Sequence, residues 1–156
     1  MLSPSSFSQT VISEYLSTAD WKGQIDTFRG VYRERRDAML GALADQLPTL
    51  SWTVPAGGFY VWLRLPEHLD SKAMLPRAVK ELVAYTPGTA FYADGTGRNA
   101  MRLCFSYPTP DFIREGIRRL AIVINGELSL LSEFSQTGPL RTLPTHSEGV
   151  LPPYAG

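Results

Sequence analysis

Two adjacent glycines followed by an aromatic strand make residues 55–65 the most constraining stretch of this sequence. The run reads Pro-Ala-Gly-Gly-Phe-Tyr-Val-Trp-Leu-Arg-Leu and is rich in the aromatic and β-branched residues that favour the centre of a sheet. Because side chains alternate along a strand, Val61 and Leu63 belong to a purely apolar face. Tyr60 and Trp62 belong to the opposite, aromatic face, which is suited to line a pocket.

The glycine pair itself has two interpretations. Glycine is tolerated at positive φ, and it also lets another group approach the backbone closely. A bulged strand entry that packs against a helix explains the same residues equally well.

Composition and charge narrow the class of protein. The chain has 156 residues, of which 44% are hydrophobic, and a formal net charge of zero at pH 7. This length is enough for one good core, and the neutral charge gives no reason to expect nucleic acid as a partner. Cys104 is the single cysteine, so an internal disulfide is impossible. No apolar run reaches the ~20 residues that span a bilayer and the start lacks a signal peptide's pattern, so we expect a cytoplasmic protein without membrane contact.

The N-terminal third is predicted to be helical. Apolar residues recur at helical spacing over residues 5–18 and again over residues 21–46. The second helix is about 40 Å long, which exceeds the width of a small domain, so its first half is expected to pack on another body. Its middle carries four arginines with interleaved acids, which favour an exposed, salt-bridged face over an anion-binding site. These arginines are Arg29, Arg33, Arg35 and Arg36.

The rest of the chain alternates short strands and helices. We expect strands at residues 50–54, 83–85 and 101–106, and helices at residues 71–83 and 110–131, with Pro76 delaying or kinking the first of these. The fold class is therefore α+β: a small mixed or antiparallel sheet packed on a long N-terminal helix and a C-terminal helix. Residues 132–156, rich in proline and glycine and without a sustained period, are expected to be a disordered tail.

Arg102 is the most informative charged residue. Alternation along its strand puts Met101 and Leu103 on the apolar face and Arg102 on the other. If that face is partly covered, the guanidinium needs a carboxylate, which its planar fork can bind in bidentate fashion. A ligand or an internal acid would serve equally well.

Other reactive residues carry weaker signals. Lys72 and Lys80 fall on the expected solvent side of an amphipathic helix, whereas a Schiff-base lysine needs a desolvated pocket. The two histidines, His68 and His146, are far apart in sequence and lack the helical spacing of metal ligands, so no metal site is expected.

Five short segments stand in an order that resembles the C-terminal part of the class I/II, fold-type I aminotransferases, closest to the aminoadipate, kynurenine and aromatic aminotransferase group. A single segment is a weak signal, but five segments in the same order are not explained by chance. The resemblance covers residues 2–131. The segments are Pro-Ser-Ser-Phe-Ser-Gln at 4–9, Tyr-Arg-Glu-Arg-Arg-Asp-Ala-Met at 32–39, Pro-Ala-Gly-Gly-Phe-Tyr-Val-Trp at 55–62, Pro-Gly-Thr-Ala-Phe-Tyr at 87–92 and Met-Arg-Leu-Cys-Phe-Ser at 101–106.

The resemblance implies specific roles. Arg102 matches the arginine that binds the substrate α-carboxylate, and Tyr60 and Phe91 match aromatic positions that border the substrate side chain. Residues 1–18 correspond to an interdomain and dimer-interface segment, and residues 19–131 to the small domain. Members of the family are homodimers that act on an amino acid and a 2-oxo acid.

The family's cofactor is pyridoxal 5'-phosphate, which acts as an electron sink while a Schiff-base lysine and a phosphate cup hold it. Neither of these elements is present in this sequence, so it offers no catalytic residue and no cofactor-binding residue. We therefore expect the chain alone to bind no pyridoxal phosphate and to be inactive, as the C-terminal portion of an aminotransferase. Two alternatives remain: the effector-sensing part of a winged-helix transcription regulator, and a non-catalytic interaction module.

Overall fold

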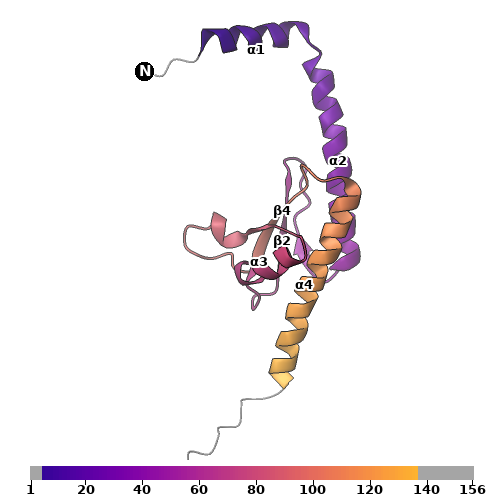
Figure 1. Ribbon diagram of the computed structural model, residues 1–156, viewed down its shortest axis with the longest axis vertical. Helices are drawn as coiled ribbons and strands as arrows, with labels where there is room; N and C mark the ends of the chain where they lie inside the picture. The colour runs from indigo at the N-terminus through magenta and orange to yellow at the C-terminus, as the bar shows by residue number, and fades with distance from the viewer. Residues whose placement is uncertain (1–4, 137–156) are drawn as a thin grey trace, which may run out of the picture.

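The computed structural model describes residues 5–136 and contains four α-helices, one 3₁₀ helix and four strands within that range (Figure 1). The chain forms these elements in order: α1 Ser6–Thr18, α2 Trp21–Gln46, β1 Ser51–Trp52, β2 Tyr60–Arg64, α3 Ser71–Lys80, β3 Thr86–Pro87, η1 Gly88–Phe91, β4 Ala100–Cys104 and α4 Pro110–Gln136.

The sheet is antiparallel throughout, with strand order β1-β2-β4-β3. The two central strands pair so that Val61 lies opposite Leu103, and Trp62 lies opposite Arg102. The α+β prediction with a small sheet is thus confirmed, and its mixed variant is excluded for the described strands.

Helices α2 and α4 pack side by side and cover the apolar face of the sheet (Figure 1). Leu43 from α2 and Leu120 from α4 meet Leu63 and Phe105 in one core, and each of these four side chains is at most 1% exposed. The apolar face read from alternation along β2 and β4 is the face that is buried here. Burying side chains of this size contributes about 1.5–3 kcal/mol each.

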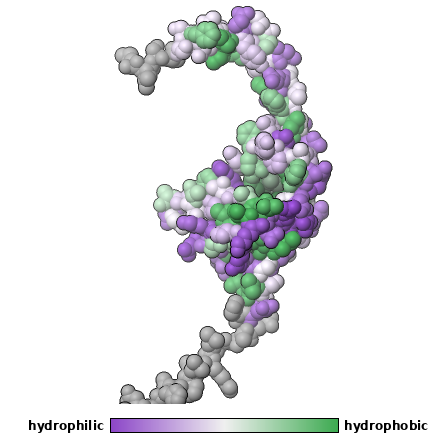
Figure 2. Space-filling model, in the orientation of Figure 1, coloured by the Kyte–Doolittle hydropathy of each residue, from purple (hydrophilic) through white to green (hydrophobic). Residues whose placement is uncertain are grey.

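The N-terminal part of the chain projects away from this body (Figure 1). Helix α1 has no buried residue, and α2 buries residues only in its second half. Figure 2 shows hydrophobic surface on α1, where Phe7 is 78% and Ile12 58% exposed. These apolar side chains find no cover within the described part of the chain.

Two predictions about the middle of the chain are wrong. The helix predicted at residues 71–83 ends at Lys80, and the strand predicted at 83–85 is instead Thr86–Pro87. The reason is a helix end in which Leu82 adopts a φ of 59° and the Val83 N–H donates to the Ala78 carbonyl. This bond closes a Schellman-type end that a glycine would normally signal. Pro76 neither delays α3 nor prevents it from forming.

The last helix also differs from its prediction. Helix α4 continues to Gln136, past Leu131, so the first residues of the expected tail are helical. The remainder of that tail, residues 137–156, lies outside the described residues. Within residues 5–136, no helix is both long and apolar enough to cross a membrane.

Candidate functional site

The structure brings the three predicted site residues together. The Arg102 guanidinium carbon lies 4.0 Å from the centre of the Tyr60 ring and 4.6 Å from the centre of the Phe91 ring. Tyr60 comes from β2, Arg102 from β4 and Phe91 from η1, so three separate elements contribute. Both rings are near enough for cation–π contact with the guanidinium. We call this arrangement the Arg102 stack.

Strand register explains two members of the stack. Tyr60 pairs with Cys104 and Trp62 with Arg102, so both aromatic rings share the sheet face of the arginine. That face is the one opposite the core, as alternation predicted.

The third member depends on close packing of η1 against β4. Strand β3 runs beside β4, with Thr86 opposite Arg102, and leads directly into η1 at Gly88. A Cβ atom on Gly88 would lie 2.8 Å from the Ala100 carbonyl oxygen and closer still to that of Gly97. Glycine at this position therefore lets η1 approach β4 closely enough to place Phe91 over the arginine.

Trp62 belongs to the site although it was not singled out as a site residue. Its ring lies 5.1 Å from the Phe91 ring in an edge-to-face arrangement with an interplanar angle of 77°. Such pairs are favourable, so Trp62 supports Phe91 in its position against Arg102. The signal was present in the sequence, because Trp62 alternates onto the same face as Tyr60.

The charge of Arg102 is not neutralised within the described part of the chain. Its side chain is partly buried, yet the described residues provide it with neither an ion-pair partner nor a hydrogen-bond acceptor. The internal salt bridge that the sequence left open is therefore not formed there. Stacking covers the faces of a guanidinium and leaves its N–H edge available for a carboxylate. Tyr60 is 39% and Phe91 43% exposed, so the stack opens to the outside.

The described residues do not fit pyridoxal phosphate. Lys22, Lys72 and Lys80 are all exposed, and none contacts the Arg102 stack. A Schiff-base lysine needs a desolvated pocket, which these exposed side chains lack. Among residues 5–136, no three histidine, cysteine, aspartate or glutamate side chains cluster as metal ligands would, and His146 lies beyond that range.

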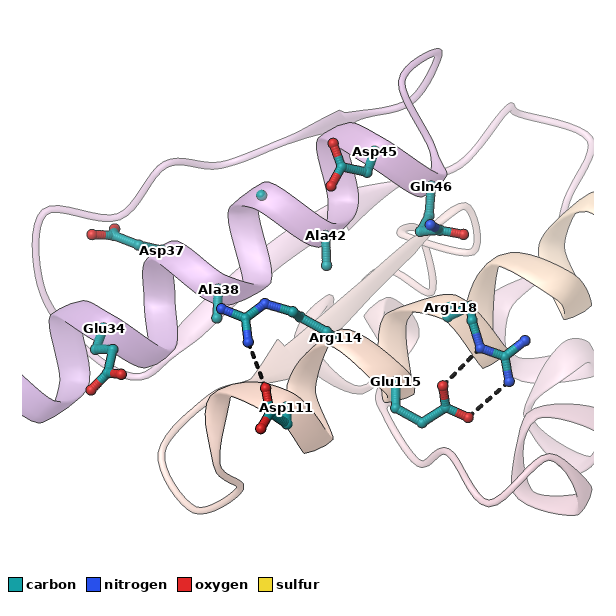
Figure 3. Close-up of a pocket in the computed structure, with 11 residues that line it drawn as sticks. Glu34, Asp37, Ala38, Ala42, Asp45, Gln46, Asp111, Arg114, Glu115 and Arg118 are labelled. Atoms are coloured by element: carbon teal, nitrogen blue, oxygen red, sulfur yellow. Dashed lines mark hydrogen bonds and ion pairs between the residues drawn. The ribbon is translucent and has the colours of Figure 1, made fainter.

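A second hollow, of about 710 Å³, lies between α2 and α4 and is lined by charged residues (Figure 3). Asp111 and Arg114 pair at 2.8 Å, and Glu115 accepts two hydrogen bonds from Arg118 (Figure 3). The charged side chains of α4 in this hollow therefore form ion pairs with one another. The hollow resembles a solvated groove between two helices more than a ligand site.

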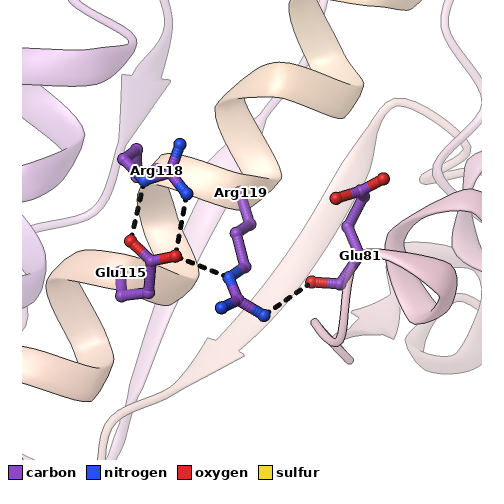
Figure 4. Close-up of polar contacts among 4 residues, drawn as sticks. All are labelled: Glu81, Glu115, Arg118 and Arg119. Carbon is purple, nitrogen blue, oxygen red and sulfur yellow. Dashed lines mark hydrogen bonds and ion pairs between the residues drawn. The ribbon is translucent and has the colours of Figure 1, made fainter.

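The same network joins α4 to the end of α3. Arg119 donates to both Glu115 and the Glu81 carbonyl oxygen (Figure 4). Hydrogen bonds from Arg118, and next from Arg119, lower the pKa of Glu115 to about 2. Glu115 therefore orients Arg119, which in turn donates to the end of α3.

The chain is similar in sequence to known proteins. The family model "Aminotransferase class I and II" matches residues 1–120. The chain is 44% identical to aromatic-amino-acid aminotransferase 1 of Thermococcus litoralis over 128 residues, which are 81% of this chain and 31% of that protein. It is 31% identical over 118 residues to the uncharacterized HTH-type transcriptional regulator YisV of Bacillus subtilis, covering 75% of this chain and 24% of the regulator.

Solved structures show the same relationship. The multiple substrate aminotransferase from Thermococcus profundus superimposes with a TM-score of 0.72 and 42% sequence identity, covering 75% of this chain and 29% of that one. The small sheet with its covering helices is thus the small domain of an aminotransferase fold. The chain belongs to the class I and II aminotransferase family. It spans about a third of the length of the aminotransferases that it matches.

Proposed function

We propose that the complete protein transfers an amino group between an amino acid and a 2-oxo acid, and that Arg102 binds the α-carboxylate of the substrate. The observation that supports this proposal is the Arg102 stack, in which a partly buried guanidinium lies against two aromatic rings without an acidic partner among the described residues. A carboxylate is the ligand that matches both the charge and the planar fork of arginine.

The stack would do two things for such a substrate. The rings of Tyr60 and Phe91 pack against the guanidinium and limit its movement, which pre-organises its N–H groups for two parallel hydrogen bonds. A carboxylate held in this way leaves the Cα–H bond and the amino group in a fixed orientation. Orientation of a reacting group contributes several kcal/mol to lowering a barrier.

Other parts of the proposal concern the cofactor and the subunit interface. Pyridoxal phosphate supplies the electron sink in this family, and residues outside this chain would hold it. We also propose that residues 1–18 lie at a subunit interface of a homodimer, which would cover the exposed apolar side chains of α1.

Steady-state kinetics of the complete protein test the role of Arg102. The panel of donors would contain phenylalanine, tyrosine, 2-aminoadipate and kynurenine, the substrates of the group that the sequence resembles. Arg102→Gln should lower kcat/KM by about 10²-fold or more, with much of the loss in KM, because one charged partner of a bidentate pair is removed. Arg102→Lys should recover only part of the activity, because lysine lacks the planar fork.

Arg64→Gln is the matched control. Arg64 alternates onto the same sheet face as Trp62 and lies opposite Ala100, but it does not contact Tyr60 or Phe91. Its replacement should leave kcat/KM within about twofold of the wild type. Equal losses in the Arg64 and Arg102 variants would show that only the charge of this face matters, and the carboxylate proposal would be abandoned.

A second candidate function is ligand sensing in a transcription regulator, which the 31% identity with YisV supports. In that case Arg102 would bind the carboxylate of an effector, and the complete protein would bind DNA without transaminating the donor panel. Sequence-specific DNA binding together with no transamination would select this function over the first.

A further inference from the structure

A basic cavity lies on the core side of the sheet, away from the Arg102 stack. It has a volume of about 460 Å³ and lies open to solvent between the middle of α2 and the turn that enters β2. We call it the Arg33 cavity. Its lining contains three arginines and two glycines but no carboxylate: Arg29, Arg33, Arg36, Gly57 and Gly58, with aromatic and small residues making up the rest.

The three arginines lie on one side of α2 because their spacing is four and then three residues. Two of them have partners: Arg29 pairs with Asp26 at 2.8 Å, and Arg36 pairs with Asp37 at 2.7 Å. Arg33 has neither an ion pair nor a hydrogen bond to any residue that the structure describes. The prediction of an exposed, salt-bridged face is therefore confirmed for Arg29, whereas Arg33 is exposed as predicted but has no ion pair among the described residues.

The turn opposite offers further donors. The backbone N–H groups of Gly57 and Gly58 make no hydrogen bond with any described residue. Gly58 has a φ of +80°, so glycine there is required by the backbone. Successive free N–H groups in such a turn form a concavity that binds anions.

Gly57 lacks any such requirement. Its φ is not positive, and a Cβ atom built on it would meet nothing within 4 Å. Neither the backbone conformation nor contacts among the described residues therefore require glycine at position 57. The open space in front of it is where a bound group would approach the backbone.

We propose that the Arg33 cavity binds a small phosphate or carboxylate anion. The anion would accept charge-assisted hydrogen bonds from the Arg33 guanidinium and bonds from the N–H groups of Gly57 and Gly58, with Arg36 at the edge of the cavity. Arg36 already donates to the Pro55 carbonyl oxygen at 3.2 Å, which ties α2 to this turn and keeps both walls in place. The site is independent of the proposed function, since it uses the other face of the sheet.

Titration of the 156-residue chain with inorganic phosphate tests this proposal. Amide resonances of the ¹⁵N-labelled chain would be followed at constant ionic strength, because added salt alone would screen surface charges. We expect saturable shifts centred on Gly57 and Gly58. In Arg33→Gln the affinity should fall about tenfold, because a charge-assisted contact is lost.

Two further variants sharpen the result. Arg114→Gln is the matched control, because Arg114 is also exposed, lies on α4 and pairs with Asp111 outside this cavity. Its phosphate affinity should stay within about twofold of the wild type. Gly57→Ala should weaken phosphate binding several-fold without lowering the midpoint of thermal unfolding, because the methyl group would fill only the open approach to the turn.

If Arg33→Gln and Arg114→Gln weaken phosphate binding equally, the effect depends only on the general positive charge of the chain, and the proposal is overturned. Shifts that disappear in Arg102→Gln but persist in Arg33→Gln would place the anion in the Arg102 stack instead. If no saturable shift is seen, the proposal that the Arg33 cavity binds a small anion is also overturned. An acidic side chain of a protein partner would then be the remaining ligand for the cavity.

Discussion

Replacing Gly88 by alanine tests whether close packing of η1 on β4 builds the Arg102 stack. A Cβ atom at this position would lie 2.8 Å from the Ala100 carbonyl oxygen and 3.0 Å from its Cβ, and closer still to the Gly97 carbonyl oxygen. These neighbours are backbone or attached directly to backbone, so they have no rotamer by which to move aside. Helix η1 must therefore shift away from β4.

The size of the effect follows from these distances. Carbon–oxygen contacts are ordinarily about 3.3 Å or longer, so η1 must move by roughly half an ångström or more. Overpacking of this kind costs about 1–3 kcal/mol, and rigid neighbours place Gly88→Ala near the upper end. For a domain of this size, we expect a fall of roughly 6–10 °C in the midpoint of thermal unfolding.

Calorimetry of the wild type, Gly88→Ala and Gly41→Ala would measure the difference. Gly41 lies on α2 and has nothing within 4 Å of its Cβ position, so its replacement should be neutral or stabilise the helix by up to about 1 kcal/mol. A second readout is the NMR shift of the Arg102 side-chain N–H, which should change in Gly88→Ala as the Phe91 ring moves. A Gly88→Ala chain as stable as the Gly41 control, with the Arg102 resonance unchanged, would refute the reasoning.

The remaining predictions concern one buried hydroxyl, one strained residue and one acid. Burial raises the pKa of Tyr85 to about 12, and its hydroxyl donates to the Ser71 carbonyl oxygen at 2.7 Å. Urea unfolding should therefore show stability falling as the pH rises from about 10 to 12 in the wild type but not in Tyr85→Phe, which should also lose about 1 kcal/mol at neutral pH. Leu82→Gly should raise stability by about 1 kcal/mol in the same assay, because Leu82 is 81% exposed and glycine removes the strain of its φ of 59°. A hydrogen bond from Arg118 is the main reason that the pKa of Glu115 falls to about 2, so stability from this pair should be complete above pH 4.5 and be lost as the pH falls toward 2. Glu115→Gln should flatten that acid limb, and an unchanged limb would show that the pair is too exposed to matter.

Strand alternation was sufficient to predict which side chains share each face of the sheet. Val61 and Leu63 are fully buried, and Tyr60 and Arg102 lie on the other face, as the period of two requires. The meeting of Phe91 with Arg102 came from a family resemblance, because residues far apart in sequence join only when the pairing order of the strands is known.

What the sequence did not reveal depends on local geometry. The end of α3 has a leucine in the left-handed conformation, where a glycine usually signals a helix end. The sequence therefore did not indicate this end, and the following strand was predicted too early. The acids interleaved with the arginines of α2 suggested a salt-bridged face, yet the nearby acids Asp26 and Asp37 pair with Arg29 and Arg36 and leave Arg33 without an ion pair among the described residues. Composition counts charges but does not say which of them can meet.

The central claim is that Arg102 binds the α-carboxylate, and one comparison tests it most directly. The complete protein would be assayed with its best amino acid donor and with the corresponding amine, which lacks only the carboxylate, in the wild type and in Arg102→Gln. The wild type should prefer the amino acid by about 10²–10³-fold in kcat/KM, and Arg102→Gln should lose most of that preference, because the arginine and the carboxylate are coupled partners. A preference that survives in Arg102→Gln at its wild-type size would show that another group binds the carboxylate and would contradict the account.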